Sequence, residues 1–176
     1  MSMSSLKDAV SLLKADHRKV EALFEQFESS KDNSKKKGLA LQICMELTLH
    51  TKIEEDVFYP ACEGSVEEDL LKEAYVEHDA AKVLIAEIEA GNPSDSFYDA
   101  KVKVLSEEIA HHVKEEEQRV DGMFAQARKA GLDMDMLGDK MAAEKIRLMA
   151  MYKAGGMQAP MTPTLTASAI GRSAHE

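Results

Sequence analysis

The sequence predicts an all-α protein, an up-down-up-down antiparallel four-helix bundle with an additional C-terminal helix and a flexible tail. Apolar residues recur at steps of three and four through four successive segments, which is the period of one buried helical face. Turn-forming residues separate these segments. Aromatic residues make up 5% of the chain and charged residues 31%, as expected for a helical bundle with a solvated exterior.

The first two expected helices each carry histidine on the apolar face. His17 lies within the stripe of the first helix, residues 6–27, and His50 and Glu54 lie within that of the second, residues 43–57. An Asp-Asn-Ser sequence near residues 31–33 favours a turn between them. The two stripes are Leu6, Val10, Leu13, His17, Val20, Phe24 and Phe27, then Ile43, Leu47, His50, Glu54 and Val57.

The third and fourth expected helices repeat this arrangement, after turns near residues 63–65 and 91–94. Their stripes are Leu71, Tyr75, His78, Ala81, Ile85 and Ile88, then Val102, Leu105, Ile109, His112, Glu116, Val120 and Met123. His111 shares its helical face with Glu108 and Glu115 instead, so we expect it to be solvated. Only one of the two adjacent histidines is therefore expected in the core.

Beyond the predicted bundle, the chain divides into a helical part and a tail. We expect residues 1–130 to form the bundle and residues 131–154 to contain a further helix that packs on the bundle or on a partner subunit. Residues 155–176 are rich in Pro, Thr, Ser and Ala and hold too little apolar surface to fold, which predicts a disordered tail.

Six ionisable residues thus fall on buried faces at similar heights along the bundle. A buried unpaired polar group costs about 1–3 kcal/mol, so such a cluster requires something that binds it together. One such histidine alone is more often an ordinary core residue, but two of the four have a glutamate one turn, ~6 Å, further along. This spacing favours two metal ions that share two carboxylates. The six candidate ligands are His17, His50, Glu54, His78, His112 and Glu116.

The order of these motifs resembles the hemerythrin-like proteins with an HHE cation-binding domain, over roughly residues 5–130. The resemblance rests on Ala-Asp-His-Arg-Lys-Val (15–20), His-Thr-Lys-Ile-Glu-Glu-Asp-Val-Phe-Tyr-Pro (50–60), Glu-His (77–78) and His-Val-Lys-Glu-Glu-Glu (112–117). It implies a pair of iron ions with an oxo or hydroxo bridge, four terminal histidines, and Glu54 and Glu116 as bridging ligands. The same donor types also suit zinc and manganese, so iron is implied by the family alone.

The chain departs from the oxygen-carrying hemerythrins at the third helix. The sites of those proteins have a five-histidine pattern, with two histidines one turn apart on the third helix. Here no second histidine lies one turn from His78. The four-histidine, two-glutamate pattern is similar to bacterial di-iron proteins linked to nitrosative stress and to repair of iron centres, and to the iron-sensing domain of a ubiquitin-ligase subunit. Tyr75, one turn before His78, is a candidate to point its hydroxyl at the vacated position. The alternative is an ordinary aromatic core residue.

Three functions remain open from the sequence. The first is a protein that binds or senses dioxygen or nitric oxide at a di-iron site. The second is an enzyme or an iron-centre repair protein that acts on peroxide or nitric oxide. The third is an iron buffer. The expected partner is a small diatomic or peroxide ligand, and the chain is expected to be a monomer or a homodimer.

Charge and composition narrow the other partners. The chain has 22 Lys and Arg against 32 Asp and Glu, a net charge of −10, which opposes binding to nucleic acid and to anionic membranes. No stretch is long and apolar enough for a membrane span, and the start lacks a signal-peptide pattern. We therefore expect a cytoplasmic protein, in which Cys44 and Cys62 are reduced thiols.

Overall fold

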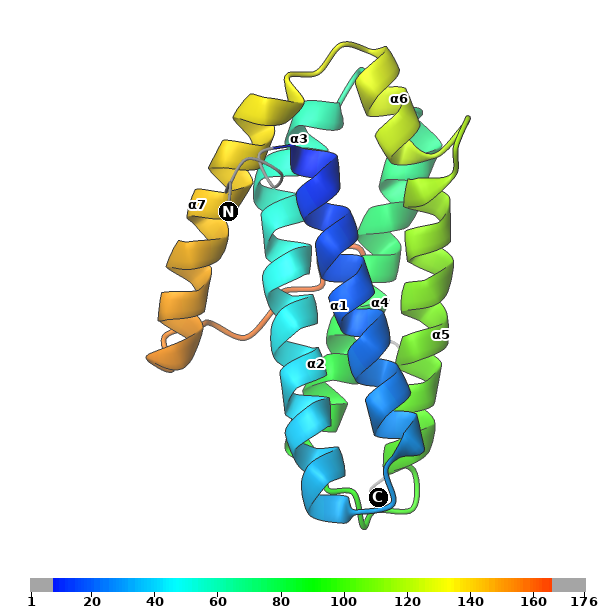
Figure 1. The fold of residues 1–176 in the computed structure, drawn as a ribbon, viewed down its shortest axis with the longest axis vertical. Coiled ribbons are helices and arrows are strands. Elements are labelled where there is room, and N and C mark those ends of the chain that lie inside the picture. The colour runs from blue at the N-terminus through cyan, green and yellow to red at the C-terminus, as the bar shows by residue number, and fades with distance from the viewer. Residues whose placement is uncertain (1–7, 166–176) are drawn as a thin grey trace, which may run out of the picture.

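The predicted four-helix bundle is present in the computed structural model, which describes residues 8–165 (Figure 1). Its four long helices form a closed ring in which α1 packs on α2, α2 on α4, α4 on α5 and α5 on α1. The bounds of these helices are α1 Ala9–Ser29, α2 Asn33–Ile53, α4 Glu68–Ala90 and α5 Tyr98–Glu117. Each of the four histidines on a predicted apolar stripe therefore comes from a different wall of the bundle.

Aspartate side chains define where several helices begin. The Asp8 carboxylate accepts a hydrogen bond from the backbone N–H of Ser11 over 2.9 Å, and the Asp32 carboxylate accepts one from Lys35 over 2.6 Å. Such caps satisfy N–H groups that have no partner within the helix. The turn predicted near residues 31–33 lies immediately before α2, so the lengths of α1 and α2 follow from local chemistry.

A π-helical turn interrupts the regular period after α2. The chain continues without a break into η1 (Glu54–Phe58) and α3 (Tyr59–Cys62), and the N–H of Tyr59 donates to the carbonyl of Glu54. Pro60 follows directly, and proline inside a helix removes one N–H and crowds the carbonyl four residues earlier. The wider turn accommodates this crowding and rotates Tyr59 toward the face that carries Glu54.

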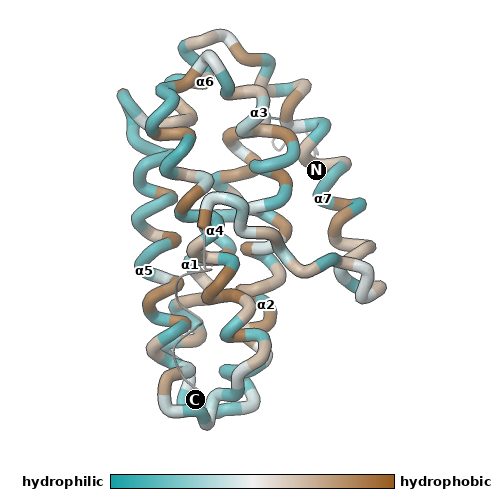
Figure 2. Tube along the Cα trace, turned by 180° about the vertical axis from the view of Figure 1, so that it is seen from behind, coloured by the Kyte–Doolittle hydropathy of each residue, from teal (hydrophilic) through white to brown (hydrophobic). Residues whose placement is uncertain are grey.

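Two apolar cores lie along the bundle, one toward each end. Leu13, Leu49, Ile53 and Phe58 belong to the core near α3, and a second core near the α1–α2 turn includes Val20, Phe24, Ile43, Leu47 and Leu105. The hydropathy-coloured trace shows apolar residues toward both ends of the bundle (Figure 2). The predicted polar residues lie between these cores, which leaves them little contact with water.

The fourth helix ends earlier than its predicted stripe. α5 stops at Glu117, and Val120 is 77% exposed, so its expected place in the core is wrong. The chain turns before Gly122, where an added Cβ would lie 2.5 Å from the carbonyl oxygen of Gln118. Only glycine fits this close approach. Met123 is buried in the core as predicted, but it belongs to a separate short helix, α6 (Met123–Lys129).

The C-terminal helix α7 (Met134–Lys153) packs on the outside of α1 and α2 (Figure 1). It buries Met134, Leu137, Met141 and Leu148 against the core near α3. None of the helices in the described part of the chain is long and apolar enough to cross a membrane.

Residues 155–165 follow a defined path although they form neither helix nor strand. This segment leaves α7 and crosses the face between α2 and α4 (Figure 2). Thr164 donates to the Asp79 carboxylate from its backbone N–H over 2.8 Å and from its hydroxyl over 2.6 Å. These polar contacts, together with Met157, which packs against the core near α3, hold this part of the expected tail in place. Residues 166–176 lie outside the described residues.

Candidate metal centre

All six candidate ligands meet in the middle of the bundle. Their side chains come from α1, α2, η1, α4 and α5, and their exposed fractions lie between 0 and 5%. They fall into two adjoining halves that share Glu54 and Glu116.

The first half joins α1 to α2. The Nε2 atoms of His17 and His50 lie 3.1 Å apart. His17 Nε2 is 3.3 Å from Glu116 Oε2, and His50 Nε2 is 3.3 Å from Glu54 Oε2. Ligand atoms from these four residues all lie within 4.8 Å of one another, which is close enough for one metal ion to contact all of them.

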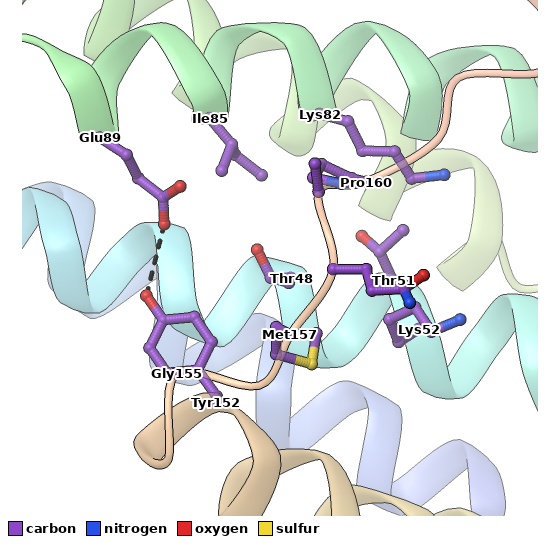
Figure 3. Close-up of a pocket in the computed structure, with 12 residues that line it drawn as sticks. Thr48, Thr51, Lys52, Lys82, Ile85, Glu89, Tyr152, Gly155, Met157 and Pro160 are labelled. Carbon is purple, nitrogen blue, oxygen red and sulfur yellow. Dashed lines mark hydrogen bonds between the residues drawn. The ribbon is translucent and has the colours of Figure 1, made fainter.

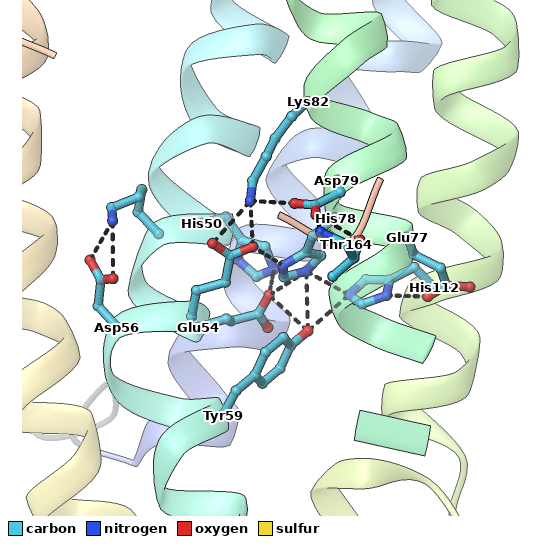
Figure 4. Close-up of polar contacts among 12 residues, drawn as sticks. His50, Glu54, Asp56, Tyr59, Glu77, His78, Asp79, Lys82, His112 and Thr164 are labelled. Atoms are coloured by element: carbon cyan, nitrogen blue, oxygen red, sulfur yellow. Dashed lines mark hydrogen bonds and ion pairs between the residues drawn. The ribbon is translucent and has the colours of Figure 1, made fainter. Parts of the chain in front are cut away.

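The second half joins α4 to α5 (Figure 4). The Nε2 atoms of His78 and His112 lie 3.2 Å apart, and His78 Nε2 is 3.2 Å from Glu54 Oε2. His112 Nε2 is 3.5 Å from Glu116 Oε1. Glu116 thus presents one oxygen to each half, and Glu54 Oε2 lies beside both His50 and His78. Each carboxylate is placed where it can bridge two metal ions.

Each of the four imidazoles is oriented by a carboxylate on its outer side. When Nδ1–H donates to that carboxylate, the Nε2 lone pair points into the cluster, which is the arrangement that supports metal-bound histidine. The Nδ1–oxygen distances are 2.7 Å for His17 to Glu117, 3.4 Å for His50 to Asp16, 3.2 Å for His78 to Glu55 and 2.6 Å for His112 to Glu77.

Protein atoms alone do not provide hydrogen-bond partners for all the polar atoms of the cluster. With each Nδ1 protonated, the facing Nε2 atoms present lone pairs to one another at close range. Glu54 Oε1 and Glu116 Oε2 are buried, and neither has a hydrogen-bond partner in the part of the chain that the structure describes. A buried carboxylate without a partner is costly, and a bound cation would neutralise both groups and accept the nitrogen lone pairs. The donor set therefore fits a pair of metal ions.

The pKa values of these residues also show that positive charge stabilises the cluster. Burial alone would lower the pKa of His17 and of His78, but the carboxylates that face each ring outweigh it and raise both pKa values to about 9. Burial alone would raise the pKa of Glu116, yet the imidazoles of His112 and His17 hold it well below its ordinary range. Without metal, protons on the imidazoles compensate the carboxylates.

A tyrosine that lies outside the predicted apolar stripes reaches into the cluster. The Tyr59 hydroxyl donates to Glu116 Oε1 over 2.9 Å and lies 3.1 Å from His78 Nε2 and 3.3 Å from His112 Nε2 (Figure 4). Burial and the Glu116 charge raise its pKa well above the ordinary value, so the phenol stays protonated. Pro60 is the feature of the sequence that could have indicated this position of Tyr59, because proline within a helix marks an irregular turn.

Tyr75 lies further from the cluster than Tyr59, whose ring it contacts. Its ring packs edge-on against the Tyr59 ring, with centroids 5.2 Å apart, and it is only partly buried. Among the contacts of the described residues, its hydroxyl makes no hydrogen bond to the cluster. The hydroxyl in the position expected for Tyr75 is therefore that of Tyr59.

A small cavity adjoins the four histidines on the side toward the second core. It leaves about 10 Å³ for the centre of a water-sized molecule, and Val20, Leu47, Ile109 and Val113 line its apolar side. This space suits about one such molecule.

Residues that the sequence placed outside the site lie outside it. His111 is on the surface with its side chain 59% exposed, and its Nε2 lies 3.3 Å from Glu115. Cys44 and Cys62 are buried free thiols, and burial raises the pKa of each to about 12, which makes them unreactive.

Comparisons with known proteins identify the family and the fold. Residues 8–124 match the Hemerythrin HHE cation binding domain. The chain is similar to a crystal structure of a hemerythrin HHE cation binding domain-containing protein from Mycobacterium kansasii, with a TM-score of 0.70, 21% identity, and coverage of 86% of this chain and 96% of that one. It is also 33% identical over 106 residues to a protein from Nostoc sp. named DNA nickase.

The Nostoc match covers 60% of this chain but only 30% of the relative, so the chain spans less than a third of that protein's length. The domain match, in contrast, spans most of the chain and contains all six residues of the cluster. The chain belongs to the hemerythrin HHE cation-binding domain family, and its buried histidine–glutamate cluster is suited to metal binding.

Proposed function

We propose that this chain is a non-heme di-iron protein that binds or senses dioxygen or nitric oxide. The observation that carries the proposal is the convergence of four Nε2 atoms and two shared carboxylates, each imidazole held from outside by a further carboxylate. In this proposal the four histidines are terminal ligands, Glu54 and Glu116 bridge the two irons, and an oxo or hydroxo group completes the bridge.

The surroundings of the cluster support a small ligand. Bound iron would supply redox activity and open coordination positions. The cavity beside the histidines has an apolar side and room for about one small molecule. The Tyr59 hydroxyl is close enough to donate a hydrogen bond to a group held within the cluster. Iron, as distinct from zinc or manganese, is supported by the family likeness, because the donor set suits all three.

Metal analysis with optical and Mössbauer spectra on protein made in iron-replete medium tests the cofactor. We expect two irons per chain. His112→Ala should abolish stoichiometric binding, because it removes a ligand atom from the cluster. His111→Ala is the matched control, since it changes the adjacent residue on the outer face and should leave iron content nearly intact. Equal losses in the two variants would contradict the assigned ligands.

A second candidate function is an enzyme or an iron-centre repair protein that acts on peroxide or nitric oxide. The observation in its favour is Tyr59, whose buried hydroxyl lies among the candidate ligands, where it can donate a hydrogen bond to peroxide or nitric oxide held in the cluster. A third is an iron buffer. Anaerobic mixing of reduced, iron-loaded protein with dioxygen, nitric oxide and peroxide separates them: a reversible adduct supports binding or sensing, turnover supports an enzyme, and no reaction supports a buffer.

The remaining properties are proposals from composition. We do not extend the name of the Nostoc relative to this chain, since a net charge of −10 opposes DNA binding. A cytoplasmic location and a monomeric or homodimeric state stay part of the proposal, to be tested by fractionation and by light scattering.

A further inference from the structure

A larger cavity lies beside the candidate metal centre, between α2, α4 and the C-terminal segment (Figure 3). Its volume is about 440 Å³, and residues 155–160 form its outer wall. The hydroxyl of Tyr152 donates to Glu89 over 3.3 Å and closes the far end. Beyond the cavity, Met161 accepts a hydrogen bond from Lys82 over 3.3 Å, which ties the wall to α4.

The inner surface of this cavity suits uncharged molecules. Ile85, Met157 and Pro160 contribute apolar surface to it. Two lysines border it, but both ammonium groups are already neutralised: Lys52 donates to Asp56 over 3.0 Å, and Lys82 is held by two acidic groups. The carboxylate of Glu89, which accepts from Tyr152 at the far end, is the remaining charged group in the lining. The rest of the inner surface lets a small uncharged molecule enter without losing strong hydration.

Thr51 separates this cavity from the small one beside the histidines. It is 6% exposed and lines both cavities, whereas Thr48, one turn earlier on α2, lines only the larger one. Thr51 directly follows His50 on α2, and the two residues line the small cavity together. Thr51 is the one residue that lines both cavities, so a direct path from the larger cavity to the cluster would run past its side chain.

A groove of about 470 Å³ between α1 and α7 offers the alternative route. Asp16 borders both this groove and the small cavity. Its carboxylate is held between Lys145 of α7 and Nδ1 of His50. An ion pair at that position obstructs an uncharged molecule, because passage would separate partly buried charges.

We propose that the cavity between α2, α4 and the C-terminal segment is the access chamber for a small uncharged ligand of the metal centre, with Thr51 as the residue that limits its passage. This inference rests on the proposed function, since it takes that ligand to be dioxygen, nitric oxide or peroxide. It adds the route, the wall that covers it and the residue that controls it.

Nitric oxide binding to reduced, iron-loaded protein, followed by stopped flow, tests the passage. Thr51→Ile adds bulk and should slow association and dissociation severalfold in the same proportion, leaving the equilibrium affinity unchanged. Thr51→Ala should speed both, which keeps the test valid if the larger side chain impairs folding. Thr48→Ile adds the same bulk one turn away and is the matched control, with rates close to those of the original protein. Ala15→Ile narrows the α1–α7 groove and should also have little effect.

A second measurement does not depend on iron. Crystals of the metal-free protein under xenon pressure should show xenon in the access chamber, since xenon is an uncharged probe of apolar space. Equal rates in the Thr51 and Thr48 variants, a larger effect from Ala15→Ile, or a chamber without xenon would overturn the route. Failure of the original iron-loaded protein to bind any of the three ligands at equilibrium would instead overturn the proposed function, and the access chamber with it.

Discussion

Glu77 illustrates how a residue outside the cluster controls a residue within it. Its carboxylate lies on α4 and accepts the Nδ1–H of His112 on α5 over 2.6 Å. The contact sets both the orientation of the ring and the position of its proton. Glu117 performs the same task for His17 over 2.7 Å and also accepts a bond from Arg18. Candidate ligands are therefore held by pairs of helices, not by their own helix alone.

Replacement of Glu77 by Gln should weaken metal binding by about 10–100-fold, the usual effect of losing a carboxylate behind a histidine ligand. The variant keeps the side-chain shape and removes the charge that supports the imidazole. Competition with a chelator of known affinity measures the change. Glu107→Gln is a suitable control, because Glu107 forms an ion pair with Lys103 on the exposed face of α5 and, among the described residues, with no other group. Identical affinities in the two variants would contradict this role for Glu77.

Tyr59→Phe should alter the reaction with dioxygen, peroxide or nitric oxide severalfold while iron content stays the same. The change keeps the ring that stacks on His78 at 5.1 Å and deletes the hydroxyl that contacts Glu116. A hydrogen bond to a charged group is worth about 1.5–3 kcal/mol, which is enough for such an effect.

Tyr75→Phe provides the control for this prediction, because it deletes a hydroxyl from the neighbouring ring. Adduct lifetimes and turnover should stay close to those of the original protein. A larger effect from Tyr75→Phe than from Tyr59→Phe would return the role to Tyr75, as the sequence first suggested.

At the level of elements, the C-terminal segment differs most from expectation. Its contacts converge on two buried residues of α4: Asp79, which is 1% exposed, and Lys82, which is 8% exposed. Lys82 also donates to Glu55, the carboxylate behind His78. The segment thus covers an ion network that ends at a candidate ligand.

Thr164→Val should loosen this segment. It deletes the hydroxyl that donates to Asp79 over 2.6 Å and leaves the buried carboxylate with one bond fewer. Backbone amide exchange in residues 157–165, measured by mass spectrometry, should become faster, while exchange in α7 stays unchanged. Thr162→Val serves as the control in the same segment. Unchanged exchange in the Thr164 variant would show that this bond does not hold the segment.

At the scale of the whole molecule, the cluster forms a polar layer between two apolar cores. Four helices contribute to that layer, so a bound metal pair would hold the entire bundle together. Removal of the metal leaves Glu54 and Glu116 to be compensated by protons on the imidazoles. Folding and metal binding should therefore be coupled.

Metal removal should lower the melting temperature, and the difference should grow with pH. In the metal-free protein His17 and His78 have pKa values raised from 6.5 to about 9, so their stabilising protonation is complete below pH 6.5 and is lost as pH rises through about 9. Metal binding competes with these protons and strengthens over the same interval. Thermal melts of both forms from pH 6 to pH 9.5 test this. A metal-free melting temperature that does not fall over this interval would refute the assignment.

The sequence by itself determined the helical bundle and the faces on which its six polar residues lie. Periodicity is a local property, and the steps that place Leu13 and Val20 in the core also place His17 there. The same reasoning correctly separated His112 from His111. It failed at Val120, because the close approach at Gly122 ends the helix before the apolar pattern ends.

Only the tertiary structure decided which groups complete the site. Tyr59 reaches the cluster because a π-turn before Pro60 changes the helical phase, and a regular period does not reveal that change. Glu77 and Glu117 meet their histidines across helix pairs, and Thr164 meets Asp79 across 85 positions of sequence. Such contacts depend on the relative rotation and height of packed helices, which the pattern along any one helix does not contain.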